Sequence, residues 1–282
     1  MAILIDGKAL AAKLKQQVKE EAVSLPRQPG LAVVLIGDNP ASRRYLDSKE
    51  KDCRDCGFLS FEYRLPEDTS EKELLELINR LNEAAEVDGI LIQMPLPEHM
   101  DSRNILQAVS AKKDVDGFHP VNVGLLSIDD ARFVPCTPAG IMEMLREYEI
   151  PIAGKRCVVV GRSNTVGKPM GRLLLQEDGT VTVCHSKTVD LGSITREADI
   201  LVSAAGVANL ITADMVKEGA VVIDVAMNRK DGGGWCGDVD FDAVAAKASY
   251  ITPVPGGVGP TTRAVLMRNL LEAARMHMGV SK

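Results

Sequence analysis

The sequence predicts an α/β protein of two lobes, each built around a parallel sheet, and three observations support this. Short apolar runs alternate with longer amphipathic segments, which is the rhythm of strands and crossover helices. The rhythm stops near residues 149–155 and then starts again. The chain has 282 residues, which is enough for two moderate domains with proper cores.

The first lobe contains three apolar runs separated by segments of helical periodicity. Strands are expected over 31–37, 58–65 and 88–94, and helices over 42–56 and 70–85. Helical stretches at 8–18 and 261–278 are expected to brace this lobe. We therefore expect a first domain over 1–140, completed by 262–282, and a second over 141–261.

The second lobe repeats the pattern with more strands. Apolar runs end at Gly161, His185, Gly206, Ala226 and Pro255. Ligands of open α/β sheets bind beyond the carboxyl ends of the strands. The loops that follow the apolar runs are therefore where functional residues are expected.

Composition and charge exclude several classes of partner. The chain is 45% hydrophobic and 26% charged, with a net charge of −6 and no basic block, so neither nucleic acid nor an anionic membrane is expected as a partner. No window has the roughly 18 apolar residues of a membrane span. The start of the chain has no signal-peptide pattern, and six cysteines then indicate reduced thiols in the cytoplasm.

Metal binding is not expected either. The four histidines show no ligand spacing, and the single C-x-x-C, Cys53 and Cys56, has no second pair to complete a zinc site. Its context is not that of a redox motif, so both cysteines are expected to pack as small apolar groups.

The first strand of the second lobe leads into an unusual glycine turn, "VVVGRSNTVGKPMGRLLL". Gly161 ends the strand, and Gly167 and Gly171 fall at the start of the next helix, but Ser163 stands where a dinucleotide fingerprint has its second glycine. Glycines there allow a sharp turn, close approach of a phosphate and tight helix packing. Taken alone, this pattern fits a phosphate site and a plain turn equally well.

The end of the next strand favours NADP over NAD. An NAD site has an acid about 20 residues further on, to bind the ribose 2′-hydroxyl. Here the chain has Ser186 and Lys187, with Arg162 behind the first glycine, which are donors for an adenosine 2′-phosphate. The alternative is that Arg162 is an ordinary surface residue.

Polar residues also follow the strands of the first lobe. Tyr45 and Lys49 share one helix face, Gln93 ends an apolar run, and Asp114 and Asp116 lie in an Asp-Gly turn. Each has a structural explanation of its own, and Lys49 alone is typical of a surface lysine. Together they fall on one edge of one predicted sheet, where a lysine, an amide and a carboxylate suit a polar heterocycle.

Eight motifs in order resemble one known family. They are "YLDSKEK", "DGILIQMPLP", "KDVDGFHPVNVG", "CTPAGI", "GRSNTVGKP", "CHSKT", "GDVDF" and "PVPGGVGPTTRAVL". Across nearly the whole chain they resemble the bifunctional methylenetetrahydrofolate dehydrogenase/methenyltetrahydrofolate cyclohydrolases. This implies a folate-binding domain followed by a Rossmann-type NADP domain, with the last helix packed back on the first lobe.

The resemblance implies roles in the first lobe. Lys49 would be the central catalytic residue, with Gln93 positioning it and tuning its charge. Tyr45 would stack on the folate, and Asp116 would hydrogen-bond and orient the pterin. These four are the implied catalytic residues.

The resemblance also implies binding residues in both lobes. Cofactor contacts would be Gly161, Arg162, Ser163, Gly167, Ser186 and Met227. Substrate contacts would be Tyr45, Lys49, Ile92, Gln93, Met94, Asp116, Pro255, Gly256, Gly257, Val258, Gly259 and Pro260. The implied reaction oxidises 5,10-methylenetetrahydrofolate with NADP and then hydrolyses the methenyl product to 10-formyltetrahydrofolate. A homodimer through the second lobe is also implied.

Several positions depart from the family pattern. Ala226 and Met227 stand where glycine and isoleucine are more frequent, Thr261 where methionine is usual, and Leu46 where valine is common. None removes a catalytic side chain, but the methyl group of Ala226 is expected to weaken or shift nicotinamide binding.

Three alternatives remain open on the sequence. One is a monofunctional methylenetetrahydrofolate dehydrogenase, against which Lys49 counts. Another is an NADP-dependent two-domain dehydrogenase of a hydroxy or amino acid, which does not account for the first-lobe motifs. The third is a nucleotide-binding protein without catalysis, against which Lys49, Gln93 and Asp116 count.

Overall fold

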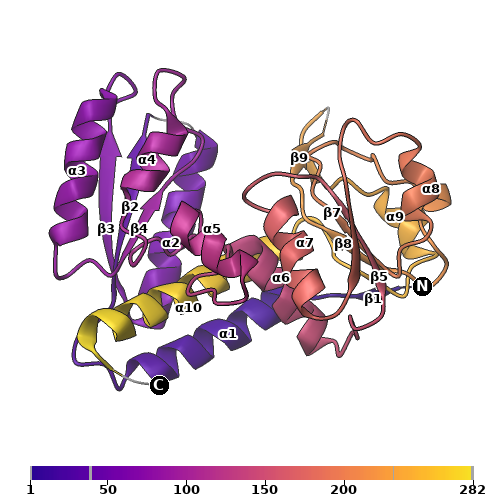
Figure 1. The fold of residues 1–282 in the computed structure, drawn as a ribbon, viewed down its shortest axis with the longest axis horizontal. Helices are drawn as coiled ribbons and strands as arrows, with labels where there is room; N and C mark the ends of the chain where they lie inside the picture. The colour runs from indigo at the N-terminus through magenta and orange to yellow at the C-terminus, as the bar shows by residue number, and fades with distance from the viewer. Residues whose placement is uncertain (1, 38–39, 231, 281–282) are drawn as a thin grey trace. The chain divides into compact units, whose positions relative to one another are not determined.

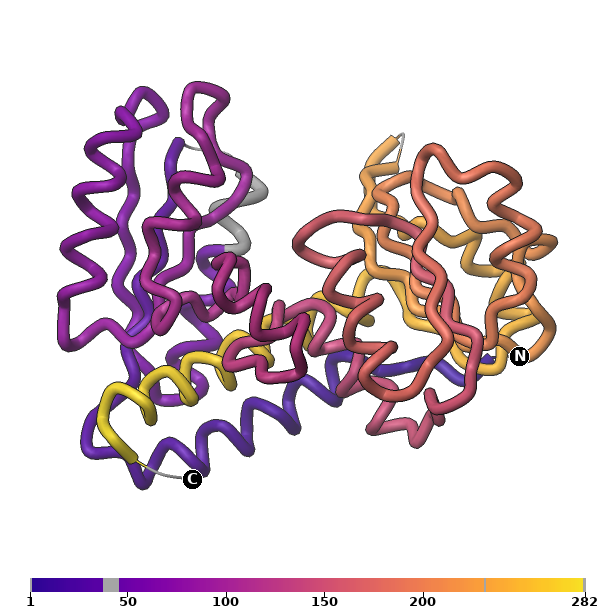
Figure 2. Tube along the Cα trace, viewed as in Figure 1, coloured from indigo at the N-terminus to yellow at the C-terminus, as the bar shows by residue number. Residues whose placement is uncertain are grey.

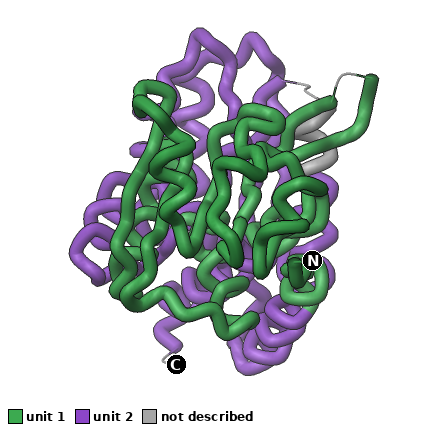
Figure 3. Tube along the Cα trace, turned by 90° about the vertical axis from the view of Figure 1, so that its right-hand side faces the viewer, with its two compact units in different colours: residues 1–12, 135–262 green, residues 13–134, 263–282 purple. Residues whose placement is uncertain are grey.

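The computed structural model describes residues 2–37, 40–230 and 232–280, and the side chains of 40–45 lie outside the description. The chain divides into two compact units, one of residues 1–12 with 135–262 and the other of 13–134 with 263–282 (Figure 3). Two helices, α1 (Gly7–Ala22) and α10 (Val258–Met278), each continue from one unit into the other. The domain limits expected at residues 140, 141 and 262 stay a prediction.

The unit of residues 13–134 and 263–282 contains a three-stranded parallel sheet. Its strands are β2 (Gly30–Ile36), β3 (Leu59–Leu65) and β4 (Gly89–Ile92), in the order β3-β2-β4 (Figure 1). The central strand β2 is buried at every position, as its continuous apolar run predicts. The expected strand 88–94 ends earlier, at Ile92, which leaves Gln93 just beyond the carboxyl end.

Two helices of this unit follow the predicted strand–helix alternation, α2 (Pro40–Cys56) and α3 (Glu71–Glu83). Two more, α4 (Ser102–Ala108) and α5 (Pro120–Ser127), come after β4 and were not predicted. A capping box begins α3, because the Ser70 hydroxyl accepts from the Glu73 N–H while the Glu73 carboxylate accepts from the Ser70 N–H. The apolar stripe of α3 then packs on β2 and β4.

The last helix packs on the elements of the first lobe, as predicted. A side chain added at Gly89 on β4 would lie 2.9 Å from Leu270 Cδ1, so α10 passes directly over this strand. The Asn269 amide donates to Val115 O at 2.8 Å and to Val134 O at 3.1 Å. Further along, Arg275 pairs with Glu21 of α1 at 2.8 Å, and the two helices lie side by side there (Figure 2).

The other unit is built on a six-stranded, all-parallel sheet of order β1-β11-β8-β7-β5-β6 (Figure 1). The strands are β1 (Ile3–Leu4), β5 (Arg156–Val160), β6 (Thr180–Cys184), β7 (Ile200–Ser203), β8 (Val221–Asp224) and β11 (Tyr250–Ile251). The sequence did not predict β1. Its two residues pair with β11, so the start of the chain belongs to this sheet.

The remaining elements of this unit surround the sheet. They are α6 (Cys136–Glu147), α7 (Gly167–Gln176), α8 (Leu191–Thr195), the 3₁₀ helix η1 (Ala213–Met215), α9 (Phe241–Ala245) and a hairpin of β9 (Asn228–Arg229) and β10 (Trp235–Cys236). The chain runs from β5 to β6 on one side and then crosses to β7 on the other side of β5. This change of direction between β5 and β7 is where a doubly wound sheet binds its ligand.

Candidate active site

Two of the predicted catalytic residues meet at the carboxyl end of β4. Lys49, half-buried on α2, donates from Nζ to Gln93 Oε1 at 2.8 Å. The Gln93 amide also donates from Nε2 to Met94 O at 2.8 Å, and its backbone N–H donates to Val34 O at 2.9 Å. Since both ends of the glutamine are held, its oxygen is fixed toward the lysine. Tyr45 lies four residues before Lys49 on the same helix, but its side chain is outside the described residues.

The loop that carries Asp116 is anchored by its buried neighbours. Lys113 donates from Nζ to Leu81 O at 3.0 Å and Ala84 O at 2.7 Å, and so caps the end of α3. Burial lowers the pKa of Lys113. Asp116 itself is half-buried, two residues beyond Asp114.

The two aspartates of this turn therefore have different environments. The Asp114 carboxylate is buried and accepts from the N–H groups of Phe118 at 3.2 Å and His119 at 2.8 Å, and from Asn122 Nδ2 at 2.7 Å. Asp114 thus organises the turn before α5, as turn chemistry predicts. Lys113 and Asn269, which anchor the same loop, were not singled out from the sequence. For Asn269 the only signal was a polar residue in a largely apolar helical stretch, and for Lys113, which lies between Lys112 and Asp114, there was none.

Ile92 and Met94, which flank Gln93, are two further predicted substrate residues, and neither is exposed. Ile92 is buried in the core of β2, β4 and α3, so its side chain belongs to the packing of this unit. Met94 is half-buried directly after Gln93. Around Gln93, this segment presents one apolar side chain and one fixed amide at the strand end.

In the other unit, the glycine turn leaves no room for side chains. Gly161 has a φ of +126°, and a Cβ there would lie 2.3 Å from Ala204 O. A Cβ on Gly167 would lie 2.1 Å from Gly161 O. The loops after β5 and β7 therefore approach at backbone distance at the point where the sheet changes direction, as the prediction of a tight turn requires.

Ser163 occupies the unusual position in this turn and caps α7. Its hydroxyl accepts from the N–H groups of Val166 at 3.1 Å and Gly167 at 3.4 Å. The hydroxyl therefore bonds two of the N–H groups that otherwise have no partner at a helix start. The helix dipole at this end favours an anion.

The remaining cofactor residues lie at the carboxyl edge of the same sheet. Arg162, Ser186 and Lys187 are exposed after β5 and β6, as donors for a phosphate must be. Met227 is 42% exposed after β8, on the opposite side of the switch point from Ser186.

Residues 255–257 lie in a tight turn directly before α10, and residues 258–260 begin that helix. Gly257 N–H donates to Pro253 O at 2.8 Å, and a Cβ on Gly7 would lie 1.8 Å from Gly257 O, so this turn lies against the start of α1. Pro255 and Gly259 are exposed, Gly256 and Pro260 are half-buried, and Gly257 and Val258 are buried. Thr261, the unusual residue that follows, is fully buried, and a Cβ on Gly140 would lie 2.9 Å from its hydroxyl. A small residue at 261 thus packs against the backbone of α6.

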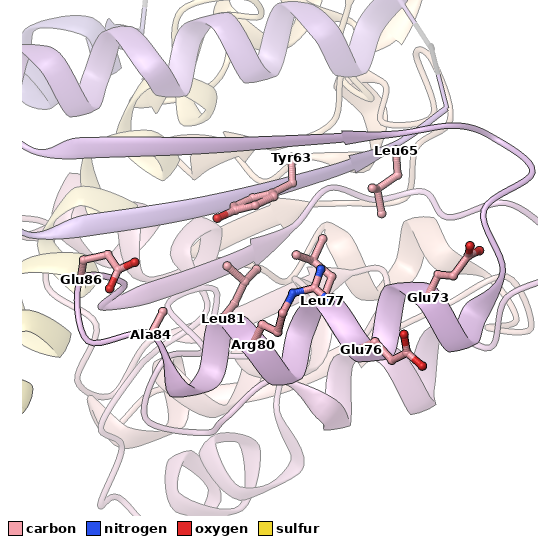
Figure 4. Close-up of a pocket in the computed structure, with 9 residues that line it drawn as sticks. All are labelled: Tyr63, Leu65, Glu73, Glu76, Leu77, Arg80, Leu81, Ala84 and Glu86. Carbon is pink, nitrogen blue, oxygen red and sulfur yellow. The ribbon is translucent and has the colours of Figure 1, made fainter.

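A groove elsewhere holds none of the predicted residues. Its volume is about 460 Å³, and it lies between the edge strand β3 and α3 (Figure 4). Tyr63 and Leu65 of β3 face Leu77 and Leu81 of α3 across it, with Glu73, Glu76 and Arg80 along the helix side. It lies on the outer side of β3, whereas Gln93 follows β4 at the opposite edge of the three-stranded sheet.

The doubly wound sheet and its glycine turn are typical of nicotinamide dinucleotide dehydrogenases, and they occur here with a separate α/β unit that carries a lysine and an amide. Comparison with known proteins makes the assignment specific. The chain matches the catalytic domain of tetrahydrofolate dehydrogenase/cyclohydrolase over residues 5–116 and its NAD(P)-binding domain over residues 135–278. This chain belongs to the tetrahydrofolate dehydrogenase/cyclohydrolase family.

Relatives of this family match over nearly their whole length. The bifunctional protein FolD of Campylobacter hominis is 56% identical over 96% of this chain and 97% of its own. The crystal structure of the bifunctional enzyme FolD from Campylobacter jejuni is 50% identical, with a TM-score of 0.96 over 98% of this chain and 99% of that one. The Trypanosoma brucei enzyme, solved with NADP and an inhibitor, is 40% identical, with a TM-score of 0.93 over 98% of both chains.

These matches confirm the predicted two-domain α/β fold and the bifunctional enzyme class, a dehydrogenase and cyclohydrolase of one-carbon metabolism. With the NADP complex of the Trypanosoma brucei relative, they also confirm NADP as the cofactor. Within the described residues, no group of three His, Cys, Asp or Glu side chains is arranged to hold a metal ion. Across the same residues, no helix combines the length and apolar character needed to cross a bilayer.

Proposed function

We propose that Lys49 is the general acid–base residue of the hydrolytic step and that Gln93 holds it in place. The observation that carries this proposal is the 2.8 Å hydrogen bond from Lys49 Nζ to Gln93 Oε1 at the end of β4. It fixes an amine at the sheet edge, where ligands of α/β proteins bind. Asp116, on the anchored neighbouring loop, would hydrogen-bond the pterin, and Tyr45 would stack on it.

The hydrolysis then moves three protons. Water attacks the carbon of the methenyl cation, and its oxygen loses both protons as it becomes the formyl carbonyl oxygen, while the nitrogen of the carbon–nitrogen bond that breaks gains one. A lysine that removes the first proton can return it to that nitrogen, and the second proton is released to solvent, because the cation and water give a neutral formyl product. General acid–base catalysis of this kind contributes about 10²- to 10⁴-fold.

The glycine turn has the features that NADP requires. The absence of side chains at Gly161 and Gly167 lets a pyrophosphate approach the backbone and the start of α7. Arg162, Ser186 and Lys187 supply donors for the 2′-phosphate. When bound, NADP accepts a hydride from the methylene carbon of the folate. The role of the protein in that step is to orient the folate, because correct orientation alone lowers such barriers substantially.

We further propose that two copies associate through the edge strand β6. Four of its five residues are not buried, and Val183 is 39% exposed on it, while Leu175 on the adjacent helix α7 is 52% exposed. An uncovered strand edge beside apolar side chains is typical of an interface. Sedimentation velocity should show a dimer, and Val183→Lys should shift it to a monomer. A monomeric wild-type chain would contradict this arrangement.

We also propose a cytoplasmic location. All six cysteines are free thiols, and five of them are buried, as expected in a reducing compartment. Fractionation of the host cell would test this, and recovery of the protein in a secreted fraction would contradict it.

The test of the catalytic proposal is Lys49→Ala, with Lys51→Ala as the matched control because Lys51 is exposed on the same helix. Each protein is mixed with methylenetetrahydrofolate and NADP, and reduced cofactor and methenyl absorbance are followed together. Wild type and Lys51→Ala should reduce NADP without accumulating the methenyl species. Lys49→Ala should lose about 10²- to 10⁴-fold in hydrolysis.

The two activities give separate outcomes. Accumulation of the methenyl species only in Lys49→Ala would establish the role of the lysine. Hydrolysis at the wild-type rate in Lys49→Ala would contradict that role. An absence of NADP reduction by the wild-type chain would contradict the folate assignment at the catalytic level.

A further inference from the structure

Two buried carboxylates lie at the carboxyl edge of the six-stranded sheet and have no part in the chemistry described above. Asp224 ends β8 and is 2% exposed, and Asp238, fourteen residues further on, is fully buried. A buried carboxylate is costly unless its oxygens are hydrogen-bonded. The partners of Asp238 come from two separate loops.

Asp238 is the common acceptor for the loops that follow β7 and β8. Its donors are Ser203 Oγ at 3.1 Å, the backbone N–H groups of Ala205 at 2.7 Å, Gly206 at 3.2 Å and Val207 at 2.8 Å, and Asn228 Nδ2 at 2.9 Å. Three consecutive N–H groups thus turn inward around one carboxylate. Val207 and Asn228 bond the same oxygen, Oδ1, so the two loops are held against each other at that atom.

The segment that carries Asp238 is itself held in place. Asp224 accepts from the N–H groups of Asp238 at 2.9 Å and Val239 at 3.0 Å. A Cβ on Gly237 would lie 1.7 Å from Asp224 Oδ2, so only glycine allows this approach. On the other side, Ile211 N–H donates to Asp238 O at 2.9 Å. The carboxylate is therefore presented from a backbone that is fixed on two sides.

The two loops lie on the nicotinamide side of the proposed dinucleotide site. The dinucleotide crosses the sheet between β5 and β7, where the strand order changes direction. Ser186 and the other 2′-phosphate donors follow β5 and β6, which places the adenosine on that side. The nicotinamide must then extend over β7 and β8, beside the exposed side chains of Val207 and Met227, which are 52% and 42% exposed.

We propose that Asp238 is a positioning residue for the nicotinamide end of the cofactor, which it sets by holding the loops after β7 and β8 in one arrangement. This inference rests on the proposed NADP site. Asp238 does not reach the cofactor itself, because it is fully buried and its oxygens are taken by five donors. It fixes the backbone on which the nicotinamide lies.

The test is Asp238→Asn, which keeps the size of the side chain but replaces one acceptor oxygen with an N–H₂ group that faces other donors. Asp240→Asn is the matched control, since Asp240 lies two residues away and its side chain makes no capping bond to α9. Calorimetry measures the affinity for NADP and for adenosine 2′,5′-bisphosphate, which lacks the nicotinamide half. Asp238→Asn should bind NADP roughly tenfold or more weakly, because several hydrogen bonds to a charged group are lost. It should bind the bisphosphate as the wild type does.

A second variant keeps the test possible if Asp238→Asn does not fold. Asn228→Ala removes one of the five donors and leaves the carboxylate in place, so a smaller loss of NADP affinity in the same direction is expected. The binding of the bisphosphate reports in each variant that the unit is folded.

The possible results separate cleanly. Unchanged NADP affinity in Asp238→Asn would overturn the positioning role. An equal loss of affinity for NADP and for the bisphosphate would also overturn it, because such a loss indicates a general structural effect. A wild-type chain that binds both ligands but does not oxidise methylenetetrahydrofolate would contradict the proposed function, and the ratio of the two affinities would still decide the role of Asp238.

Discussion

The two groups of site residues are built in different ways. In the unit of β2, β3 and β4, the atoms proposed to act are ends of side chains, such as Lys49 Nζ and Gln93 Oε1, which are joined by one hydrogen bond. In the unit of the six-stranded sheet, the surface offered to the ligand is mainly backbone, shaped by Gly161, Gly167 and the N–H groups around Asp238.

The difference follows from what each site has to do. Acid–base chemistry needs a group that gains and loses a proton, which only a side chain provides. A pyrophosphate needs several N–H donors at close range, and backbone at a glycine turn before a helix can provide them. A backbone site should therefore fail abruptly when one methyl group is added, whereas a side-chain site should weaken by degrees.

Beyond the loss expected for Lys49→Ala, the largest expected effect is at the glycine turn. Gly167→Ala places a Cβ 2.1 Å from Gly161 O and 2.8 Å from Arg162 N, so the backbone must shift. A misplacement of about 1 Å can cost on the order of 10²-fold, and we expect such a loss in kcat/KM for NADP. Hydrolysis of methenyltetrahydrofolate added without NADP should remain.

The control for this substitution is Gly124→Ala on α5, where a Cβ meets nothing within 4 Å. Steady-state kinetics of both activities in both variants would measure the contrast. An equal loss of the two activities in Gly167→Ala would show that the turn is not specific to the cofactor.

A smaller, graded effect is expected where side chains hold the folate unit together. Asn269→Leu removes the hydrogen bonds to Val115 O and Val134 O, and the free energy of unfolding should fall by about 1–3 kcal/mol. Because Val115 precedes Asp116, KM for the folate should rise while KM for NADP stays unchanged. Urea unfolding and the two KM values would measure this, with Asn104→Leu on the exposed face of α4 as the control. If Asn269→Leu kept the wild-type KM for the folate, the proposed link between Asn269 and the folate site would be contradicted.

The smallest effect concerns pH and Asp88, which lies just before β4. Burial opposes ionisation of Asp88, but hydrogen bonds from His277, Arg27 and the Gly30 N–H outweigh it and hold its pKa below the usual range. A depressed carboxyl pKa stabilises the fold above the unfolded value near 4, and this contribution is lost as the pH falls through the folded pKa. In Asp88→Asn, the free energy of unfolding should therefore fall less steeply as the pH is lowered. Urea unfolding over about three pH units, from roughly pH 6 to 3, would measure this. The exposed Asp68→Asn should leave the curve as in the wild type.

Local patterns were enough to predict most elements and the strand ends at which Gln93 and the glycine turn lie. The apolar run before Gln93 ended at Ile92, so the amide stood at a strand end, and the turn glycines marked the start of α7 at Gly167. Both predictions depend on periodicity and on backbone geometry, which are properties of a few neighbouring residues. The catalytic roles of Lys49, Gln93 and Asp116 stay predictions.

The sequence by itself determined the alternation of strands and helices in each lobe, the two parallel sheets, the glycine turn and the family. Only the tertiary structure decided that Asp114 organises its turn while Asp116 stays half-exposed, that β1 joins the second sheet, and that Asp238 gathers two loops. The physical reason is distance along the chain. Asn269 bonds the carbonyl of a residue 154 positions away, and Asp238 bonds N–H groups about 30 positions away, so no local pattern records these contacts. They arise only once each unit has folded.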